Sequence, residues 1–123
     1  MNEKCNLESI SLIWLDKNAN LTEENRQTQD KLRSIISHLK IFDNCQLCCN
    51  FLQQNIDQEQ DRFILILSGQ LGQEIIEQVH EIAQIISIFV FCLNKDKNEL
   101  WAKNYKKVFL FLNIFVCLFF VLI

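Results

Sequence analysis

Short apolar segments alternate along the chain with longer segments in which apolar residues recur at every third or fourth position. The apolar segments cover residues 9–15, 63–67 and 88–93, with a shorter one at residues 40–42. Continuous apolar runs of this length are typical of strands that are buried on both faces of a parallel sheet. The alternation therefore predicts an α/β fold, with a doubly wound, mostly parallel sheet of four to five strands and helices on both faces.

The first two predicted helices have recognisable starts. Thr22 is a suitable N-cap, and Glu23 and Glu24 in the next turn interact favourably with the helix dipole. Asp43 is a suitable N-cap for the second helix. Helical spacing then predicts the buried faces, formed by Leu32, Ile35, Ile36 and Leu39 in the first helix and by Cys45, Cys48, Cys49 and Leu52 in the second.

Two more helices follow the later apolar segments. Residues 68–72 predict a turn into a third helix, whose inward side chains extend as far as residue 86. These inward residues are Ile75, Ile76, Val79, Ile82, Ala83 and Ile86. Residues 94–98 predict a charged loop, and residues 99–107 predict a short fourth helix. Strands and helices then alternate throughout the chain, which is the order expected of a doubly wound domain.

The last segment, residues 108–123, contains no charged side chain and follows an expected domain of residues 1–107. One alternative for it is a transmembrane helix, with Lys103, Lys106 and Lys107 on the cytoplasmic side as the positive-inside rule prefers. Such a helix would be about 24 Å long, which is shorter than the roughly 30 Å hydrocarbon core of a bilayer. The positions that mark this membrane segment are Val108, Phe111, Phe115, Phe119 and Ile123.

The other alternative is a truncated or distorted last βα unit. A doubly wound domain with four strands favours a fifth, and residues 108–112 stand where that strand is expected. Residues 113–123 would then form a closing helix, although they lack the polar face that such a helix normally has. In both alternatives an exposed Phe-rich segment would seek a partner.

Composition indicates the cellular compartment of the protein and excludes one class of partner. The net charge is −3, and Lys and Arg are scattered, which argues against a basic face for nucleic acid. Residues 1–6 lack the apolar core of a secretory signal. We therefore expect an intracellular protein, either cytoplasmic or anchored to a membrane and facing the cytosol. In that compartment the six cysteines are expected to be thiols.

Candidate ligand-binding residues lie in the loops that follow the predicted strands, because parallel sheets bind ligands outside the carboxyl ends of their strands. They are Asp16, Ser68, Gly69, Gly72 and Asn94. A single loop aspartate is usually a solvated turn residue, so Asp16 alone is a weak cation ligand. Gly69 and Gly72 precede a helix, whose N-terminal N–H groups attract anions, but the third glycine of the dinucleotide motif is missing. A tight turn with close helix–strand packing is the favoured interpretation.

Catalytic and metal-binding patterns are weak. Cys45, Cys48 and Cys49 have a spacing seen in zinc sites, but no second pair of ligands follows at a suitable distance. The same cysteines fall on the apolar face of a predicted helix, where cysteine is a small core residue. The sequence therefore predicts no catalytic residues, no metal and no cofactor, and it favours a protein that is not an enzyme.

Four short stretches resemble a known module. They are IWLD at residues 13–16, LKIFD at 39–43, SGQLG at 68–72 and WAK at 101–103. The module stands at the N-terminus of large multidomain eukaryotic proteins, ahead of an arginine ADP-ribosyltransferase domain or kinesin-light-chain-like tetratricopeptide repeats. The resemblance covers roughly residues 9–108 and implies a receiver-like, flavodoxin-like fold with a role in regulation or protein interaction.

Two departures limit what the resemblance implies. A receiver carries a phosphoacceptor aspartate at the end of its third strand, where this chain has Ser68. After Lys107 the apolar segment replaces any downstream domain, so ADP-ribosyl transfer is not implied. The leading hypothesis is a non-catalytic regulatory or interaction module with an unknown protein partner. The alternatives are a small ligand- or phosphate-binding domain that uses the strand-end loops, and a fragment of a longer ADP-ribosyltransferase-type protein.

Overall fold

The computed structural model describes residues 10–55, 62–92, 94–113 and 116. Within these residues five strands alternate with four helices. The elements are β1 (Ile10–Leu15), α1 (Glu23–Arg33), β2 (His38–Phe42), α2 (Cys45–Asn55), β3 (Arg62–Ser68), α3 (Gly69–Val79), β4 (Ile85–Phe91), α4 (Lys95–Ala102) and β5 (Val108–Phe111).

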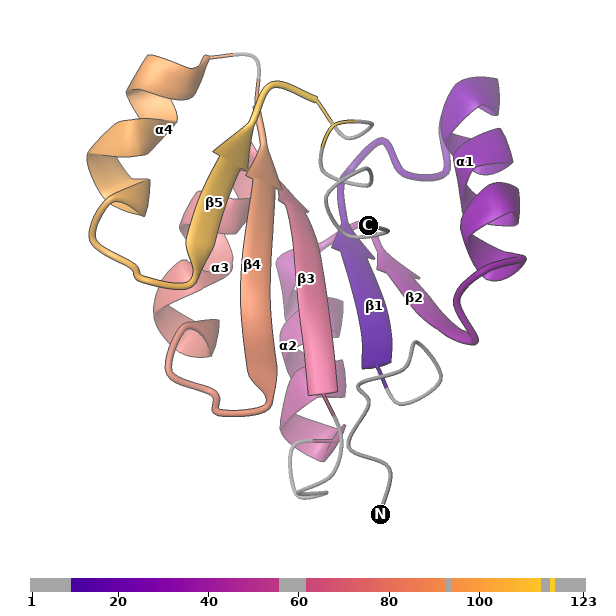
Figure 1. The fold of residues 1–123 in the computed structure, drawn as a ribbon, viewed down its shortest axis with the longest axis horizontal. Coiled ribbons are helices and arrows are strands. Elements are labelled where there is room, and N and C mark those ends of the chain that lie inside the picture. The colour runs from indigo at the N-terminus through magenta and orange to yellow at the C-terminus, as the bar shows by residue number, and fades with distance from the viewer. Residues whose placement is uncertain (1–9, 56–61, 93, 114–115, 117–123) are drawn as a thin grey trace.

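The five strands form one sheet in the order β2-β1-β3-β4-β5, and every neighbouring pair is parallel (Figure 1). β1 therefore lies between β2 and β3, although it is the first strand in the sequence. The predicted α/β fold with a parallel sheet is confirmed. Four to five strands were expected, and the described sheet has five.

Helices cover both faces of the sheet, as predicted. On one face, side chains from α2, α3 and α4 pack on residues such as Ile13, Leu65 and Ile88. Figure 1 shows α2 and α3 behind β3 and β4. On the other face, Leu32 of α1 packs in a cluster with Trp14 and the central strands. The strands read as continuously apolar because their alternating side chains enter both layers.

Each described helix starts with a polar side chain that accepts the backbone N–H three residues further on. The pairs are Thr22 with Asn25, Asn44 with Leu47, Ser68 with Leu71, and Asn94 with Lys97. Thr22 was predicted to do so. The expectation for Asp43 was wrong by one residue, since Asn44 is the acceptor. The fourth helix was expected to begin at residue 99. It begins at Lys95, because Asn94 is its N-cap.

Two predicted helices were too long at their C-terminal ends. α1 ends at Arg33, so Ile35 is 51% exposed and Leu39 belongs to β2. α3 ends at Val79, and Ile86 lies on β4 with 41% of its surface exposed. In both places the apolar residues of a turn and of the next strand continue the helical spacing by coincidence, and no glycine or proline marks the helix end.

The segment after residue 107 begins as a strand. Val108 and Phe111, which one alternative placed in a membrane helix, lie in β5. That placement was wrong for these two residues, because their backbone groups pair with β4 from Ile88 onward. Phe115, Phe119 and Ile123 lie outside the described residues. Among the helices that the structure describes, none has the length and apolar character needed to cross a membrane.

Candidate functional site

The carboxyl ends of the strands form a cleft with a volume of about 370 Å³, which we call the strand-end cleft. In the sheet, β2 lies on one side of β1, and β3, β4 and β5 lie on the other. The cleft opens at this change of direction, which is the usual position of a ligand in a parallel sheet. Its lining comprises Asp16, Asn18, Thr22, Glu24, Asn25, Ser68, Phe91, Cys92, Leu112 and Asn113. Two of the predicted site residues, Asp16 and Ser68, therefore lie in one cleft.

A second cleft of about 410 Å³ adjoins the first through Cys92, which lines both. Its other lining residues are Gly69, Gln70, Gln73, Asn94, Lys97 and Asn98. The predicted site residues are thus divided between two neighbouring hollows, with Gly69 and Asn94 in the second. Gly72 lines neither of the two clefts.

Asp16 is buried, with 7% of its surface exposed, and its carboxylate holds the loop that follows β1. Oδ1 of Asp16 accepts the backbone N–H of Asn18 at 3.0 Å. The backbone N–H of Asp16 donates to the carbonyl of Phe42 at the end of β2. An aspartate that accepts the N–H two residues ahead forms an Asx turn, so this side chain has a structural role.

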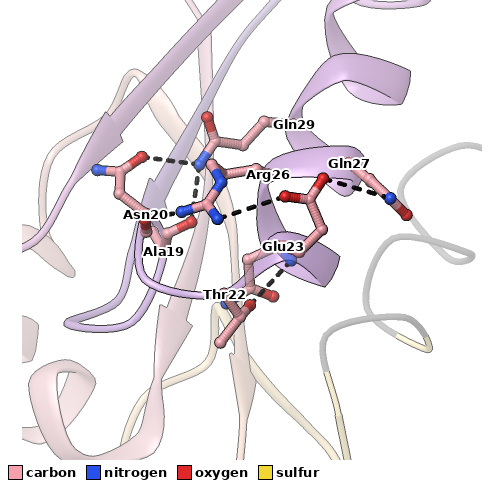
Figure 2. A network of polar contacts seen from close by, with 8 residues as sticks. Ala19, Asn20, Thr22, Glu23, Arg26, Gln27 and Gln29 are labelled. Atoms are coloured by element: carbon pink, nitrogen blue, oxygen red, sulfur yellow. Dashed lines mark hydrogen bonds and ion pairs between the residues drawn. The ribbon is translucent and has the colours of Figure 1, made fainter.

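Side chains of α1 fix the rest of this loop in place (Figure 2). Arg26 donates to the carbonyl oxygen of Asn20 at 2.9 Å and forms an ion pair with Glu23. Gln29 donates to the carbonyl oxygen of Ala19 at 2.8 Å and to the side chain of Asn20 at 2.9 Å. The polar wall of the strand-end cleft is therefore attached to a helix.

Ser68 and Gly69 form the junction between β3 and α3. The hydroxyl of Ser68 accepts the N–H of Leu71 at 3.4 Å and caps α3. A Cβ atom on Gly69 would lie 2.9 Å from Cβ of Cys92 and 3.0 Å from Oδ1 of Asn98. Glycine at position 69 thus allows the start of α3 to approach the end of β4 and the side chain of Asn98 closely.

The favoured sequence interpretation, close packing that needs glycine, fits Gly69 better than Gly72. A Cβ atom on Gly72 would lie 3.5 Å from Leu67 and 3.5 Å from the ring of Trp101, at ordinary contact distance. Gly72 therefore lies where α3 packs against β3 and α4.

Asn94 and Asn98 organise the wall of the second cleft. Asn94 accepts the N–H of Lys97, and its carbonyl accepts the side chain of Asn98 at 2.8 Å. Asn98 in turn accepts the indole N–H of Trp101 at 2.9 Å. Sequence reasoning missed Asn98. A usable signal was its position four residues after Asn94, which caps α4, and three residues before Trp101.

Cys92 was also missed, because it falls inside the apolar segment predicted as a strand. Burial raises the pKa of its thiol, while Lys95 and a hydrogen bond with Asn98 act in the opposite direction. The group that joins the two clefts is therefore a thiol at neutral pH, and a thiol is a weaker nucleophile than a thiolate.

The cysteines of α2 face the core, as predicted. Cys48 is fully buried, and Cys45 and Cys49 are half-buried against the same apolar cluster. The thiol of Cys45 donates to the carbonyl of Leu71 at 3.6 Å. Within the described ranges, no three His, Cys, Asp or Glu side chains are grouped so that they could share a metal ion.

Cys48 gives a pH-dependent prediction. Burial, reinforced by Cys49 and Cys45, raises the pKa of its thiol to about 12. The folded protein thus holds this proton more tightly than the unfolded chain, whose thiol has a pKa of about 8.5. The stabilisation is complete below that pH and is lost as the pH rises toward 12, by at most about 1.4 kcal/mol per unit.

Two measurements check this prediction. The free energy of unfolding, measured by urea titration between pH 8 and pH 10, should fall more steeply in the wild type than in Cys48→Ala. At pH 8.5, iodoacetamide should modify half-buried Cys49 before Cys48, which is on the same helix. Equal alkylation rates in the folded protein would contradict the prediction.

The chain matches no protein-family model, no curated protein and no solved structure. Its function must therefore be inferred from the residues and their geometry.

Proposed function

We propose that this chain is a receiver-like module that regulates or binds another protein and performs no catalysis itself. The strand order β2-β1-β3-β4-β5 supports the proposal, since this is the order of flavodoxin-like folds, which include receivers. The short sequence stretches that resemble the eukaryotic N-terminal module fall at the ends of β1, β2 and α4 and at the junction of β3 and α3.

One observation carries the proposal. The polar side chains at the strand ends, where a receiver would transfer a phosphoryl group, are bonded to the loops and helices that they begin. Asp16 holds its own turn, Ser68 caps α3 and Asn94 caps α4. A hydroxyl that accepts a helix N–H replaces the phosphoacceptor carboxylate at the end of β3. This edge of the sheet therefore has a structural role, and regulation operates by binding.

The partner in this proposal is a protein, and the chain acts inside the cell. The cysteines that the structure describes, Cys45, Cys48, Cys49 and Cys92, are free thiols, which suits a reducing compartment.

The proposal predicts that the full chain does not accept a phosphoryl group. After incubation with acetyl phosphate and Mg²⁺ at neutral pH, intact-mass spectrometry should find the unmodified mass. Incorporation of one phosphoryl group in the wild type, and its loss in Asp16→Asn, would show that the strand ends still perform receiver chemistry. A well-characterised receiver treated in parallel serves as the positive control.

A second candidate function is the binding of a small ligand in the strand-end cleft, which the buried carboxylate of Asp16 in its wall favours. Titrating the ¹⁵N-labelled chain with MgCl₂ and then with inorganic phosphate distinguishes the two functions. The interaction module predicts no saturable shift at the amides of Asn18, Ser68 or Gly69. A saturable shift that disappears in Asp16→Asn would favour the ligand-binding domain.

A further inference from the structure

A cleft of about 480 Å³ lies between α3 and α4, which pack against each other on one side of the sheet (Figure 1). We call it the α3–α4 cleft. It is lined by Gln73, Glu74, Glu77 and Gln78 from α3 and by Trp101 and Tyr105 from α4 and the turn after it. It shares no lining residue with the strand-end cleft, so it is a separate feature of the surface.

The aromatic wall of the α3–α4 cleft is held in position by its neighbours. The indole N–H of Trp101 donates to Oδ1 of Asn98 at 2.9 Å, and a Cβ atom on Gly72 would contact the indole ring at 3.5 Å. The ring of Tyr105 contacts those of Trp101 and His80, with centroids 6.4 and 4.7 Å away. Aromatic rings attract cations over their faces, and rings that are already fixed lose little freedom when a ligand binds.

The other wall of the cleft is acidic. Glu74 and Glu77 are exposed on successive turns of α3, a helix that contains no lysine or arginine. Within the part of the chain that the structure describes, neither carboxylate forms an ion pair. Like charges three residues apart repel each other, and Glu77 lies in the last turn, where the helix dipole favours a cation. The two carboxylates therefore destabilise α3 itself, and a bound cation would offset this cost.

We propose that the α3–α4 cleft binds an arginine side chain from a basic segment of a partner protein. The proposal rests on the function proposed above, an interaction module, and adds the chemistry of its partner. A guanidinium is planar, stacks on aromatic rings and donates to carboxylates, so it uses both walls of the cleft. A divalent metal ion suits the cleft less well, because it requires several oxygen ligands and no three acidic, histidine or cysteine side chains of the described residues are grouped for one.

Titration of the ¹⁵N-labelled full chain with the peptide acetyl-Gly-Arg-Gly-amide tests the proposal. The control probe is acetyl-Gly-citrulline-Gly-amide, since citrulline has nearly the same shape as arginine but no charge. We expect the arginine peptide to produce saturable shifts at the indole N–H of Trp101 and at the backbone amides of Glu74 and Glu77. The citrulline peptide should bind at least about tenfold more weakly, because it lacks the charge that the carboxylates attract.

Two double variants test the role of the carboxylates. In Glu74→Gln/Glu77→Gln, the affinity for the arginine peptide should fall about tenfold, because two exposed ion pairs are lost. Glu81→Gln/Glu99→Gln removes two exposed carboxylates that do not line the cleft, and it should bind the peptide as the wild type does. The Tm of Glu74→Gln/Glu77→Gln should stay level or rise, because the repulsion within α3 is removed. Equal losses of affinity in the two double variants would overturn the proposal.

Other results would assign the cleft to a different occupant. Absence of saturable shifts, or equal binding of the arginine and citrulline peptides, would overturn the proposal. Tighter binding of spermidine than of the peptide at the same amides would overturn it in favour of a small polyamine. Shifts that depend on protein concentration alone would overturn it in favour of a second copy.

The same spectra separate this proposal from the function on which it rests. Saturable shifts at the amides of Asn18 and Ser68, with none at Glu74, would move the basic ligand to the strand-end cleft. That result would overturn the α3–α4 site and leave the interaction module in place. Transfer of a phosphoryl group to the chain would instead overturn the interaction module, whatever the peptide does.

Discussion

Replacing Trp14 with alanine is expected to lower the free energy of unfolding by about 3–5 kcal/mol. Trp14 is the largest fully buried side chain that the structure describes, and it lies on β1, an interior strand of the sheet. Truncation removes its apolar contacts and leaves a cavity that a parallel sheet closes poorly. Since domains are stable by about 5–15 kcal/mol, this single change should leave the protein partly unfolded at 37 °C. Urea titration followed by circular dichroism measures the effect.

Phenylalanine at position 14 is the matched control. The indole N–H of Trp14 is buried and has no hydrogen-bond partner among the described residues. An unsatisfied buried donor costs about 1–3 kcal/mol, so removing it offsets part of the lost packing. Trp14→Phe should therefore destabilise the protein by less than half as much as Trp14→Ala. Equal losses for the two variants would contradict this prediction.

The same substitution at the two glycines of α3 is expected to have opposite effects. At Gly69 a new methyl group would lie 2.9 Å from Cβ of Cys92, so Gly69→Ala forces the backbone or Asn98 to move. Overpacking of this kind costs about 1–3 kcal/mol. At Gly72 the methyl group would meet its neighbours at 3.5 Å, and alanine favours a helix over glycine by up to about 1 kcal/mol. Gly72→Ala should therefore be neutral or stabilising.

Thermal unfolding of the two alanine variants separates these effects. In a domain of this size, a change of 1 kcal/mol shifts Tm by about 4 °C. We expect Tm to fall in Gly69→Ala and to stay level or rise in Gly72→Ala. Neither glycine has a positive φ, so backbone strain does not contribute to the comparison. A fall in both variants would indicate that helix packing at Gly72 is tighter than its distances imply.

The order of strands and helices could be predicted because buried parallel strands are apolar on both sides. Residues 63–67 and 88–91 stand out for this reason, and both belong to strands in the structure. Helix ends could not be predicted as well. Ile36 and Ile86 continue a helical pattern in the sequence, yet Ile36 lies in the loop before β2 and Ile86 lies in β4, because apolar spacing alone does not mark where a helix ends.

The candidate site could be predicted only in part. Asp16 and Ser68 lie in one cleft because parallel strands end at the same edge, which follows from the fold class alone. Cys92 and Asn113 line the same cleft but were not among the candidates. Cys92 is indistinguishable in sequence from a strand residue. Asn113 looked like an interruption of an apolar segment, and the contact of its side chain with the backbone N–H of Val116 depends on where β5 ends.

The interior position of β1 has a consequence for how the chain folds during synthesis. β1 is made first, yet one of its edges pairs with β3, which begins only at Arg62. Until that strand leaves the ribosome, the apolar edge of a β1–β2 pair stays open, and such edges are prone to aggregate. The N-terminal half of the chain therefore cannot complete this edge of the sheet until β3 has been made. Slowing translation within residues 43–61 should lengthen the time for which this edge needs protection by chaperones.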